Sequence, residues 1–194
     1  SSEELSRVIP TWSFSGGIVW NPVEKSAVAL SLNHTERAPS GQELFSNGPH
    51  VATAAFEIGD PELDTERVTG VDLSFRREAG PVTGSVSVFY NHFDNYIGQF
   101  NSGEEEDDLP VYLYQGVRAN FYGFEASVKS SILREERNEL TADLQWDYVR
   151  AEVRDRTEDL PRITPMRARA GLNYKRSSLF DARIELQHVF EQDD

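Results

Sequence analysis

The chain contains 194 residues, of which 38% are hydrophobic and none is cysteine. No stretch approaches the roughly 20 apolar residues that a membrane helix needs, so the sequence excludes a helical membrane protein. A transmembrane β-barrel stays open, because its apolar residues stand at alternate positions. The absence of cysteine excludes disulfides and zinc sites built on thiolates. The net charge of −14 argues against a nucleic-acid partner and is compatible with a cationic or metal ligand, or with solubility alone.

Alternation of apolar and polar residues predicts about eight β-strands of about ten residues. The alternation is strict toward the end of the chain, where residues 140–148 are apolar at every even position and polar at every odd one. Such a pattern places the apolar side chains on one face of a strand and the polar side chains on the other. In chain order, the predicted strands cover residues 12–20, 28–34, 71–75, 85–97, 122–128, 140–148, 166–174 and 182–190.

The strands predict an all-β fold, an antiparallel up-and-down meander with no long helix. One turn of helix is expected at most, in the region from Gly41 to Phe45. The last strands should also form one continuous apolar surface, which in a membrane barrel faces lipid. Its predicted members are Leu140, Leu144, Trp146, Ala168, Ala170, Leu172, Ile184 and Leu186.

The predicted connections alternate between short and long. Short connections lie near residues 21–25, 78–81, 134–138 and 175–178, and long ones cover residues 35–65, 98–114 and 151–164. Short turns at one side and long loops at the other are typical of outer-membrane barrels. A soluble β-sandwich would also show alternating strands, but its connections would not be expected to segregate by length so regularly.

The segments from Glu36 to Phe45 and from Gly59 to Glu66 read ERAPSGQELF and GDPELDTE. They resemble the R-A-P-x-x-x-E-L-Y and G-N-P-x-L-x-P-E patterns of TonB-dependent outer-membrane receptors. This sequence departs from the family pattern at Phe45, Asp60 and Thr65, which stand where the family usually has Tyr, Asn and Pro.

Two further segments carry the same resemblance. Residues 86–97 are similar to the family strand vFyn-x-x-x-n-y-I, and residues 119–125 are similar to its strand a-x-i-x-G-x-E. The matching segments follow one another in family order and together cover roughly residues 30–175. The chain is thereby identified as a member of the TonB-dependent receptors, with the fold of a transmembrane β-barrel segment.

The resemblance implies a barrel of about 22 strands whose lumen is closed by a plug domain. We therefore expect residues 1–194 to be a single partial barrel domain, without the plug domain, the TonB-coupling motif and the remaining strands. The implied function is active uptake of a scarce metal or metal chelate, either zinc or a ferric siderophore, without enzymatic activity or a cofactor. The implied partners are outer-membrane lipid, the plug domain of the same parent chain, TonB acting through that plug, and the metal or chelate. The implied location is the bacterial outer membrane.

Within the family, Ser46 to Thr53 and Phe56 to Gly59 resemble receptors associated with zinc uptake. His50 is then a candidate metal ligand, because imidazole suits zinc, and Glu57 is a second ligand-binding candidate. A lone histidine in a long polar loop is also commonly just solvated, and no second histidine stands at ligand spacing. A complete site would need a further ligand from the plug or from another loop.

Four charged residues are predicted to face the lumen. Asp143 and Asp147 share the polar face of one strand, and Arg167 and Arg169 share that of the next, so they could pair across an antiparallel hairpin. Such pairs would stabilise the barrel wall or hold the plug. The run from Glu104 to Asp108 would draw cations or bind divalent ions that bridge lipopolysaccharide, or it is simply solvated.

Two other classes of protein remain open from the sequence. One is a self-contained small outer-membrane barrel, which would usually finish on an aromatic strand, whereas this chain finishes with residues 191–194, EQDD. The other is a soluble ligand-binding β-sandwich, which partition between detergent and buffer would distinguish. No nucleophile motif surrounds any serine, and there is no phosphate-binding loop or dinucleotide fingerprint, so no catalytic residue is predicted.

Overall fold

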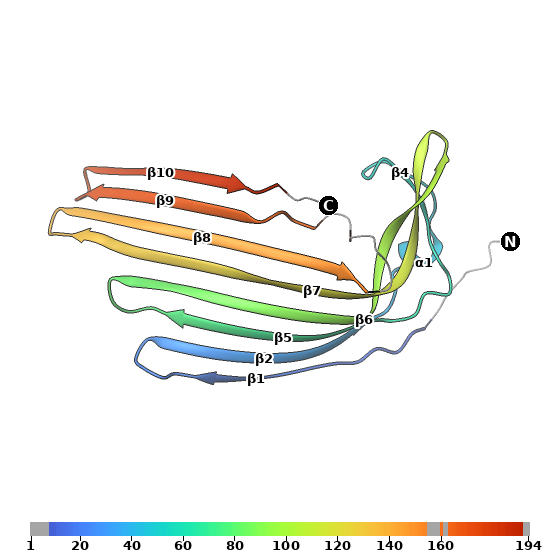
Figure 1. The fold of residues 1–194 in the computed structure, drawn as a ribbon, viewed down its shortest axis with the longest axis horizontal. Helices are drawn as coiled ribbons and strands as arrows, with labels where there is room; N and C mark the ends of the chain where they lie inside the picture. Colours follow the sequence, from blue (N-terminus) through green and yellow to red (C-terminus); the bar gives the residue numbers. More distant parts are fainter. Residues whose placement is uncertain (1–7, 155–159, 161–162, 192–194) are drawn as a thin grey trace.

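The described part of the chain, residues 8–154, 160 and 163–191 of a computed structural model, forms one curved sheet of ten strands with one short helix (Figure 1). Eight strands lie side by side in the order β1-β2-β5-β6-β7-β8-β9-β10, and each pair is antiparallel. This confirms the predicted antiparallel meander. The strands are β1 (Ser13–Trp20), β2 (Ser26–Arg37), β5 (Glu66–Arg77), β6 (Val82–Glu106), β7 (Leu109–Arg134), β8 (Asn138–Val153), β9 (Arg167–Arg176) and β10 (Phe180–Val189).

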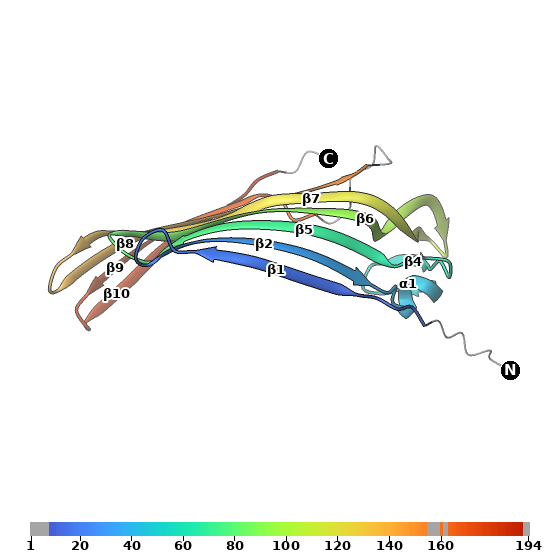
Figure 2. The ribbon, with the colours of Figure 1, turned by 90° about the horizontal axis from the view of Figure 1, so that it is seen from below.

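Short turns gather at one end of the sheet and long connections at the other (Figure 1). Seen from below, the sheet is bowed along its length (Figure 2). The connection between β8 and β9, predicted as a long loop, lies partly outside the described residues. Residues 1–7 and 192–194 lie wholly outside them. Among the residues that the structure describes, no helix has the length and apolar character to cross a membrane.

One face of the sheet is apolar from strand to strand. The pairing of β8, β9 and β10 aligns Leu144 with Ala170 and Ala170 with Leu186. It also places Leu172 of β9 opposite Ile184 of β10. The predicted continuous apolar surface is therefore confirmed. These side chains stay exposed, and Leu186 reaches 73% exposure. The same face continues to the first strands through the row Ile18, Leu30, Leu73, Val88, Phe124 and Tyr148.

The opposite face is polar and lies inside the curve. On it, Arg183 of β10 reaches Asp143 of β8 although β9 lies between them, with two nitrogen–oxygen distances of 2.7 and 3.0 Å. Gly171 of β9 leaves the space for this pair, because a Cβ at that position would meet both side chains. Curvature brings side chains of non-adjacent strands together on the concave side of a sheet, so the polar face is the concave face and the apolar face is convex.

Strands β6 and β7 form a hairpin much longer than the sequence predicted. They have 25 and 26 residues, so the prediction of a long loop over residues 98–114 is wrong, and these strands exceed the expected length of about ten. The hairpin turns at Asp107 and Asp108, whose φ angles are 51° and 60°. Positive φ at both central residues is the requirement of a two-residue type I′ turn, and aspartate tolerates that conformation.

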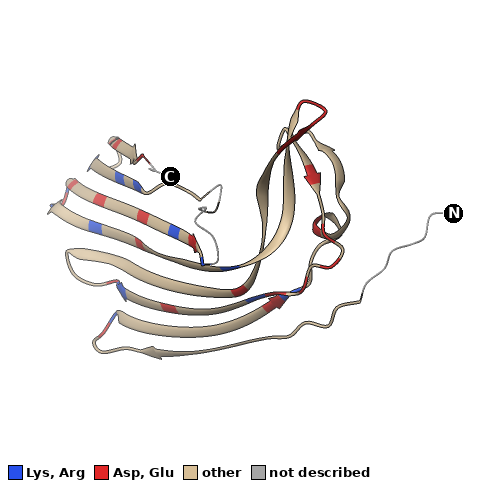
Figure 3. Ribbon diagram, turned by 45° about the vertical axis from the view of Figure 1, so that its right-hand side comes forward, with Lys and Arg blue, Asp and Glu red and all other residues tan. Residues whose placement is uncertain are grey.

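The far part of this hairpin bends away from the main sheet and ends in an acidic tip (Figures 1 and 3). Irregular pairing between Phe93 and Tyr96 marks the bend, since bulges kink a strand and increase its twist. The long loop supports the extension, because β4 (Ala55–Ile58) pairs in parallel with β7. A further strand, β3 (Asn47–His50), pairs with β4. These two short strands raise the number of strands above the eight predicted.

Helix α1 (Gly41–Phe45) lies in the same long loop, where the sequence predicted one helical turn. The hydrophobic clusters of the described chain lie at this end of the sheet and attach the loops to it. The first contains Leu44, Leu63 and Ile97. The second contains Phe100, Val117, Ala119, Ala151, Val153 and Leu160.

Candidate functional site

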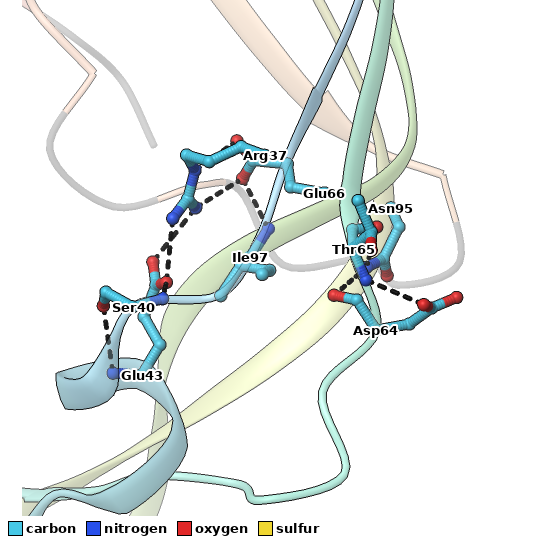
Figure 4. A network of polar contacts seen from close by, with 8 residues as sticks. All are labelled: Arg37, Ser40, Glu43, Asp64, Thr65, Glu66, Asn95 and Ile97. Atoms are coloured by element: carbon cyan, nitrogen blue, oxygen red, sulfur yellow. Dashed lines mark hydrogen bonds and ion pairs between the residues drawn. The ribbon is translucent and has the colours of Figure 1, made fainter. Parts of the chain in front are cut away.

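Arg37, at the end of β2, holds the long loop against the sheet (Figure 4). Its guanidinium donates two hydrogen bonds of 2.8 and 3.0 Å to Glu43 of α1. It donates two more, of 3.0 and 3.1 Å, to Glu66 at the start of β5. Glu66 also accepts the backbone N–H of Ile97 in β6 at 3.0 Å. One arginine therefore connects α1 to three strands of the sheet.

Helix α1 begins in a capping box. The hydroxyl of Ser40 accepts the backbone N–H of Glu43 at 3.2 Å, and the carboxylate of Glu43 accepts the backbone N–H of Ser40 at 2.6 Å. Burial raises the pKa of Glu43, but the hydrogen bonds from Arg37 and Ser40 outweigh it and hold that pKa below its ordinary value. Glu43 is thus an ionised anchor that fixes the helix, and with it the neighbouring Gln42.

Glu57 of β4 is a carboxylate that is only 2% exposed and is surrounded by neutral donors. Oε2 accepts from the amide of Gln42 at 2.9 Å and from the hydroxyl of Tyr114 at 3.1 Å, and Oε1 accepts from the hydroxyl of Thr53 at 2.9 Å. Burial raises the pKa of Glu57, whereas hydrogen bonds from Gln99 and from these three donors lower it by more. The carboxylate is therefore ionised at neutral pH.

His50, at the end of β3, lies beside this carboxylate. Its Nδ1 is 3.5 Å from Oε1 of Glu57 and 3.1 Å from Oγ1 of Thr53, and its side chain is 46% exposed. The structure therefore brings together the two residues that the resemblance singled out, and their contact with a ligand stays a prediction. They border a cavity of about 290 Å³ lined by Gln42, Ser46, Asn47, Gly48, Pro49, His50 and Glu57.

His50 and Glu57 form at most part of a metal site. The residues that the structure describes contain no group of three or more His, Asp or Glu side chains that could hold a metal ion. This includes the acidic run from Glu104 to Asp108, which lies at the tip of the β6–β7 hairpin (Figure 3). A metal bound at His50 would need further ligands from outside the described residues or from the metal's own chelator.

The four charged residues predicted for the lumen lie on the concave face of β8 and β9. Arg167 pairs with Asp147 across these strands at 2.9 Å, the kind of contact that the sequence suggested. Asp143 instead binds Arg183 of β10. The side chain of Arg169 in β9 lies 3.7 Å from an oxygen of Glu185, which is also in β10. Each of these pairs joins a carboxylate of one strand to an arginine of another strand. That the charges face a lumen stays a prediction.

A cavity of about 540 Å³ opens beside these pairs on the concave face. Its polar lining includes Ser85, Ser87, Glu125, Gln145, Asp147 and Arg167. The sequence pattern placed Arg183 and Glu185 on the polar face of the last strand, but it gave no sign that they would reach across β9.

Sequence reasoning also missed the donors that surround Glu57. They come from α1, from the turn after β3, from β6 and from β7: Gln42, Thr53, Gln99 and Tyr114. None of them carries a local motif. They meet only because β4 pairs with the extension of β7, which the sequence did not predict.

A curved antiparallel sheet with an exposed apolar convex face, a polar concave face and short turns at one end is the wall of a transmembrane β-barrel. The family model described as TonB dependent receptor-like, beta-barrel matches residues 5–191. The chain therefore belongs to the β-barrel family of the TonB-dependent receptors. Members of this family are receptors and not enzymes. They are located in the bacterial outer membrane, and so is this chain.

Solved structures of the same fold are transporters and receptors. The copper transporter OprC has 19% sequence identity and a TM-score of 0.72 over 89% of this chain. A mutant of the ferric enterobactin receptor PfeA from Pseudomonas aeruginosa has 14% identity and a TM-score of 0.61 over 91%. The FrpB iron transporter from Neisseria meningitidis has 16% identity and a TM-score of 0.54 over 84%. The matches cover 26%, 27% and 24% of those chains, so this chain spans about a quarter of their length.

Proposed function

We propose that this chain forms part of the barrel wall of a receptor that takes up a scarce metal across the outer membrane, with zinc as the metal. His50 in the long loop makes the ligand contact, and Glu57 supplies the negative charge beside it. A ferric siderophore is the second candidate, because two of the similar structures are named for iron or ferric enterobactin. The plug domain of the same parent chain would close the lumen, and TonB would act through that plug.

The observation that carries the proposal is the ionised, buried Glu57. Its hydrogen-bond donors are neutral, and the only ion-pair partner that the described residues give it is His50. A carboxylate that is covered from water and has no permanent cation beside it attracts one, because little water lies against it to screen its charge. The acidic tip from Glu104 to Asp108 adds negative potential at the same end of the barrel, which favours a cation over an anionic ferric chelate.

The test is uptake by cells that lack the chromosomal gene and carry the full-length receptor on a plasmid. We expect the receptor to restore uptake of radioactive zinc at nanomolar supply, and His50→Ala to reduce it about tenfold or more. His34→Ala is the matched control, because His34 lies on the apolar outer face, stacked on Phe14, and its loss should leave uptake unchanged. Uptake of an iron-55 siderophore but not of zinc, or equal zinc uptake with His50→Ala, would contradict the assignment.

A further inference from the structure

We infer that Glu57 is a positioning residue and that Nε2 of His50 is the atom that binds the metal. The inference rests on the proposed function for the presence of a metal and deepens it by assigning separate roles to the two residues. It replaces the simpler expectation that imidazole and carboxylate both coordinate the ion.

The carboxylate of Glu57 has no free capacity for a metal. Two carboxylate oxygens offer about four lone-pair positions. Gln42 and Tyr114 donate to Oε2, Thr53 donates to Oε1, and Gln99 donates a fourth hydrogen bond to the carboxylate, while Nδ1 of His50 lies 3.5 Å from Oε1. With only 2% of the residue exposed, coordination by Glu57 would leave at least one of these buried donors unpaired, which is unfavourable because water cannot replace the lost acceptor.

The hydroxyl of Thr53 determines which nitrogen of His50 carries the proton. It has one proton, and the ionised carboxylate 2.9 Å away attracts it more strongly than the backbone carbonyl of His50 at 3.2 Å. The oxygen of Thr53 is then left as an acceptor toward Nδ1 of His50. Both neighbours of Nδ1, this oxygen and Oε1 of Glu57, are therefore acceptors, so Nδ1 carries the proton. In the neutral ring, Nε2 keeps the lone pair that a metal needs.

Nδ1 of His50 is hydrogen-bonded to Thr53, and the carboxylate of Glu57 lies 3.5 Å away, an arrangement close to that of metal-binding histidines. A ligating imidazole donates its other N–H to a carboxylate, which fixes the tautomer and the ring orientation and makes the free nitrogen a stronger ligand. The partners of Nδ1 hold the buried edge of the ring of His50, and the ring is 46% exposed, so the opposite edge with Nε2 is the accessible one. The site thus offers one oriented imidazole to a divalent metal such as zinc that has an open coordination position.

The first test reads the tautomer directly, by nitrogen-15 NMR of the full-length receptor in lipid, labelled at histidine. His50→Ala identifies the signals of His50 by their loss. We expect Nδ1 to be protonated and Nε2 to be unprotonated in the neutral ring, and zinc chloride to shift Nε2 while Nδ1 keeps its proton. A protonated Nε2 in the metal-free receptor, or loss of the Nδ1 proton on zinc addition, would overturn the inference. This measurement on the unmutated protein needs no variant of Glu57 to fold.

The second test compares zinc affinities of variants of the same receptor. Glu57→Gln should weaken zinc binding about 10–100-fold and populate the other tautomer of His50, because a neutral amide holds the N–H less strongly. Glu62→Gln is the matched control, since it removes one exposed negative charge from the same loop and should change neither readout. An unchanged tautomer in Glu57→Gln would overturn the positioning role.

The two tests separate failure of the inference from failure of the proposed function. Saturable zinc binding that shifts neither nitrogen of His50 would overturn the inference and leave a zinc receptor standing. No saturable zinc binding by the intact receptor would contradict the proposed function and, with it, the role of Nε2.

Discussion

Arg37 shows how one side chain can determine the shape of a loop. A guanidinium presents several N–H groups in a fixed plane, so it can bind two carboxylates with two bonds each, as Arg37 does with Glu43 and Glu66. Its partners stand in α1 and at the start of β5, 6 and 29 residues away in sequence. The Arg37–Glu43 pair also holds the helix that presents Gln42 to Glu57.

Replacement of Arg37 by methionine should therefore open the loop without dismantling the sheet. We expect local opening of α1 to become easier by about 1–2 kcal/mol, since charge-assisted hydrogen bonds are lost but Arg37 is partly exposed to solvent. Hydrogen exchange of the amides of Leu44 and Ser46 in the full-length receptor measures this directly. Arg67→Met is the control, because Arg67 makes one 3.2 Å contact with the exposed Asp64 and should cost less than 1 kcal/mol. Equal exchange rates in the two variants would refute the anchoring role of Arg37.

At the scale of residues, the sequence predicted which residues gather but not how they bind one another. The family pattern pointed to His50 and Glu57, and the structure places them 3.5 Å apart. The family pattern could not predict that Glu57 is saturated with hydrogen bonds, because the donors to Glu57 lie in four separate segments of the chain. The pairing of Asp143 with Arg183 was also beyond a pattern that describes adjacent strands, because it depends on curvature and on the small size of Gly171.

At the scale of elements, α1 depends on the ionised state of Glu43. The folded chain holds the pKa of Glu43 below its ordinary value of 4.5. A carboxyl whose pKa is lower in the folded state stabilises that state above its unfolded pKa, and this contribution disappears as the pH falls through the folded pKa. The capping box and the bonds to Arg37 should therefore weaken only in acid.

Glu43→Gln provides the test of this pH dependence. At pH 7 the variant should show faster exchange of the α1 amides than the unmutated receptor, after correction for the intrinsic effect of pH on exchange. The difference should shrink as the pH falls below 4.5, because the native carboxylate then becomes protonated and loses the same interactions. A difference that stays constant from pH 7 to pH 3 would mean that the charge of Glu43 does not hold the helix.

The strands themselves were the most predictable elements. Alternation located all eight strands of the main path, since each has one apolar and one polar face. Alternation failed in the far part of the β6–β7 hairpin, because it predicts a loop from Gly98 to Tyr114, where the structure has two paired strands. There the pairing of β4 with β7 and the turn at Asp107 and Asp108 extend the strands, and both are contacts that periodicity does not describe.

At the scale of the whole molecule, the two faces of the sheet define its surroundings. The convex face exposes large apolar side chains on every strand of the main path, whereas the concave face carries charge pairs and serine residues. In water such an apolar face would need a covering layer, whereas in a membrane lipid covers it. The long loops, α1 and the site around Glu57 then lie on the side of the membrane that carries the longer loops, which in outer-membrane barrels is the extracellular side.

The most direct test of this account is the environment of neighbouring side chains on one strand. The chain has no cysteine, so single spin labels can be placed at Leu144→Cys and Leu172→Cys on the convex face, and at Gln145→Cys and Asn173→Cys on the concave face. In the full-length receptor in lipid, with any cysteine elsewhere replaced, the labels at positions 144 and 172 should be relaxed strongly by oxygen and weakly by a water-soluble nickel complex. The labels at positions 145 and 173 should show little contact with lipid. The reverse pattern, or equal access of the nickel complex to both sets, would contradict the assignment of the apolar face to lipid.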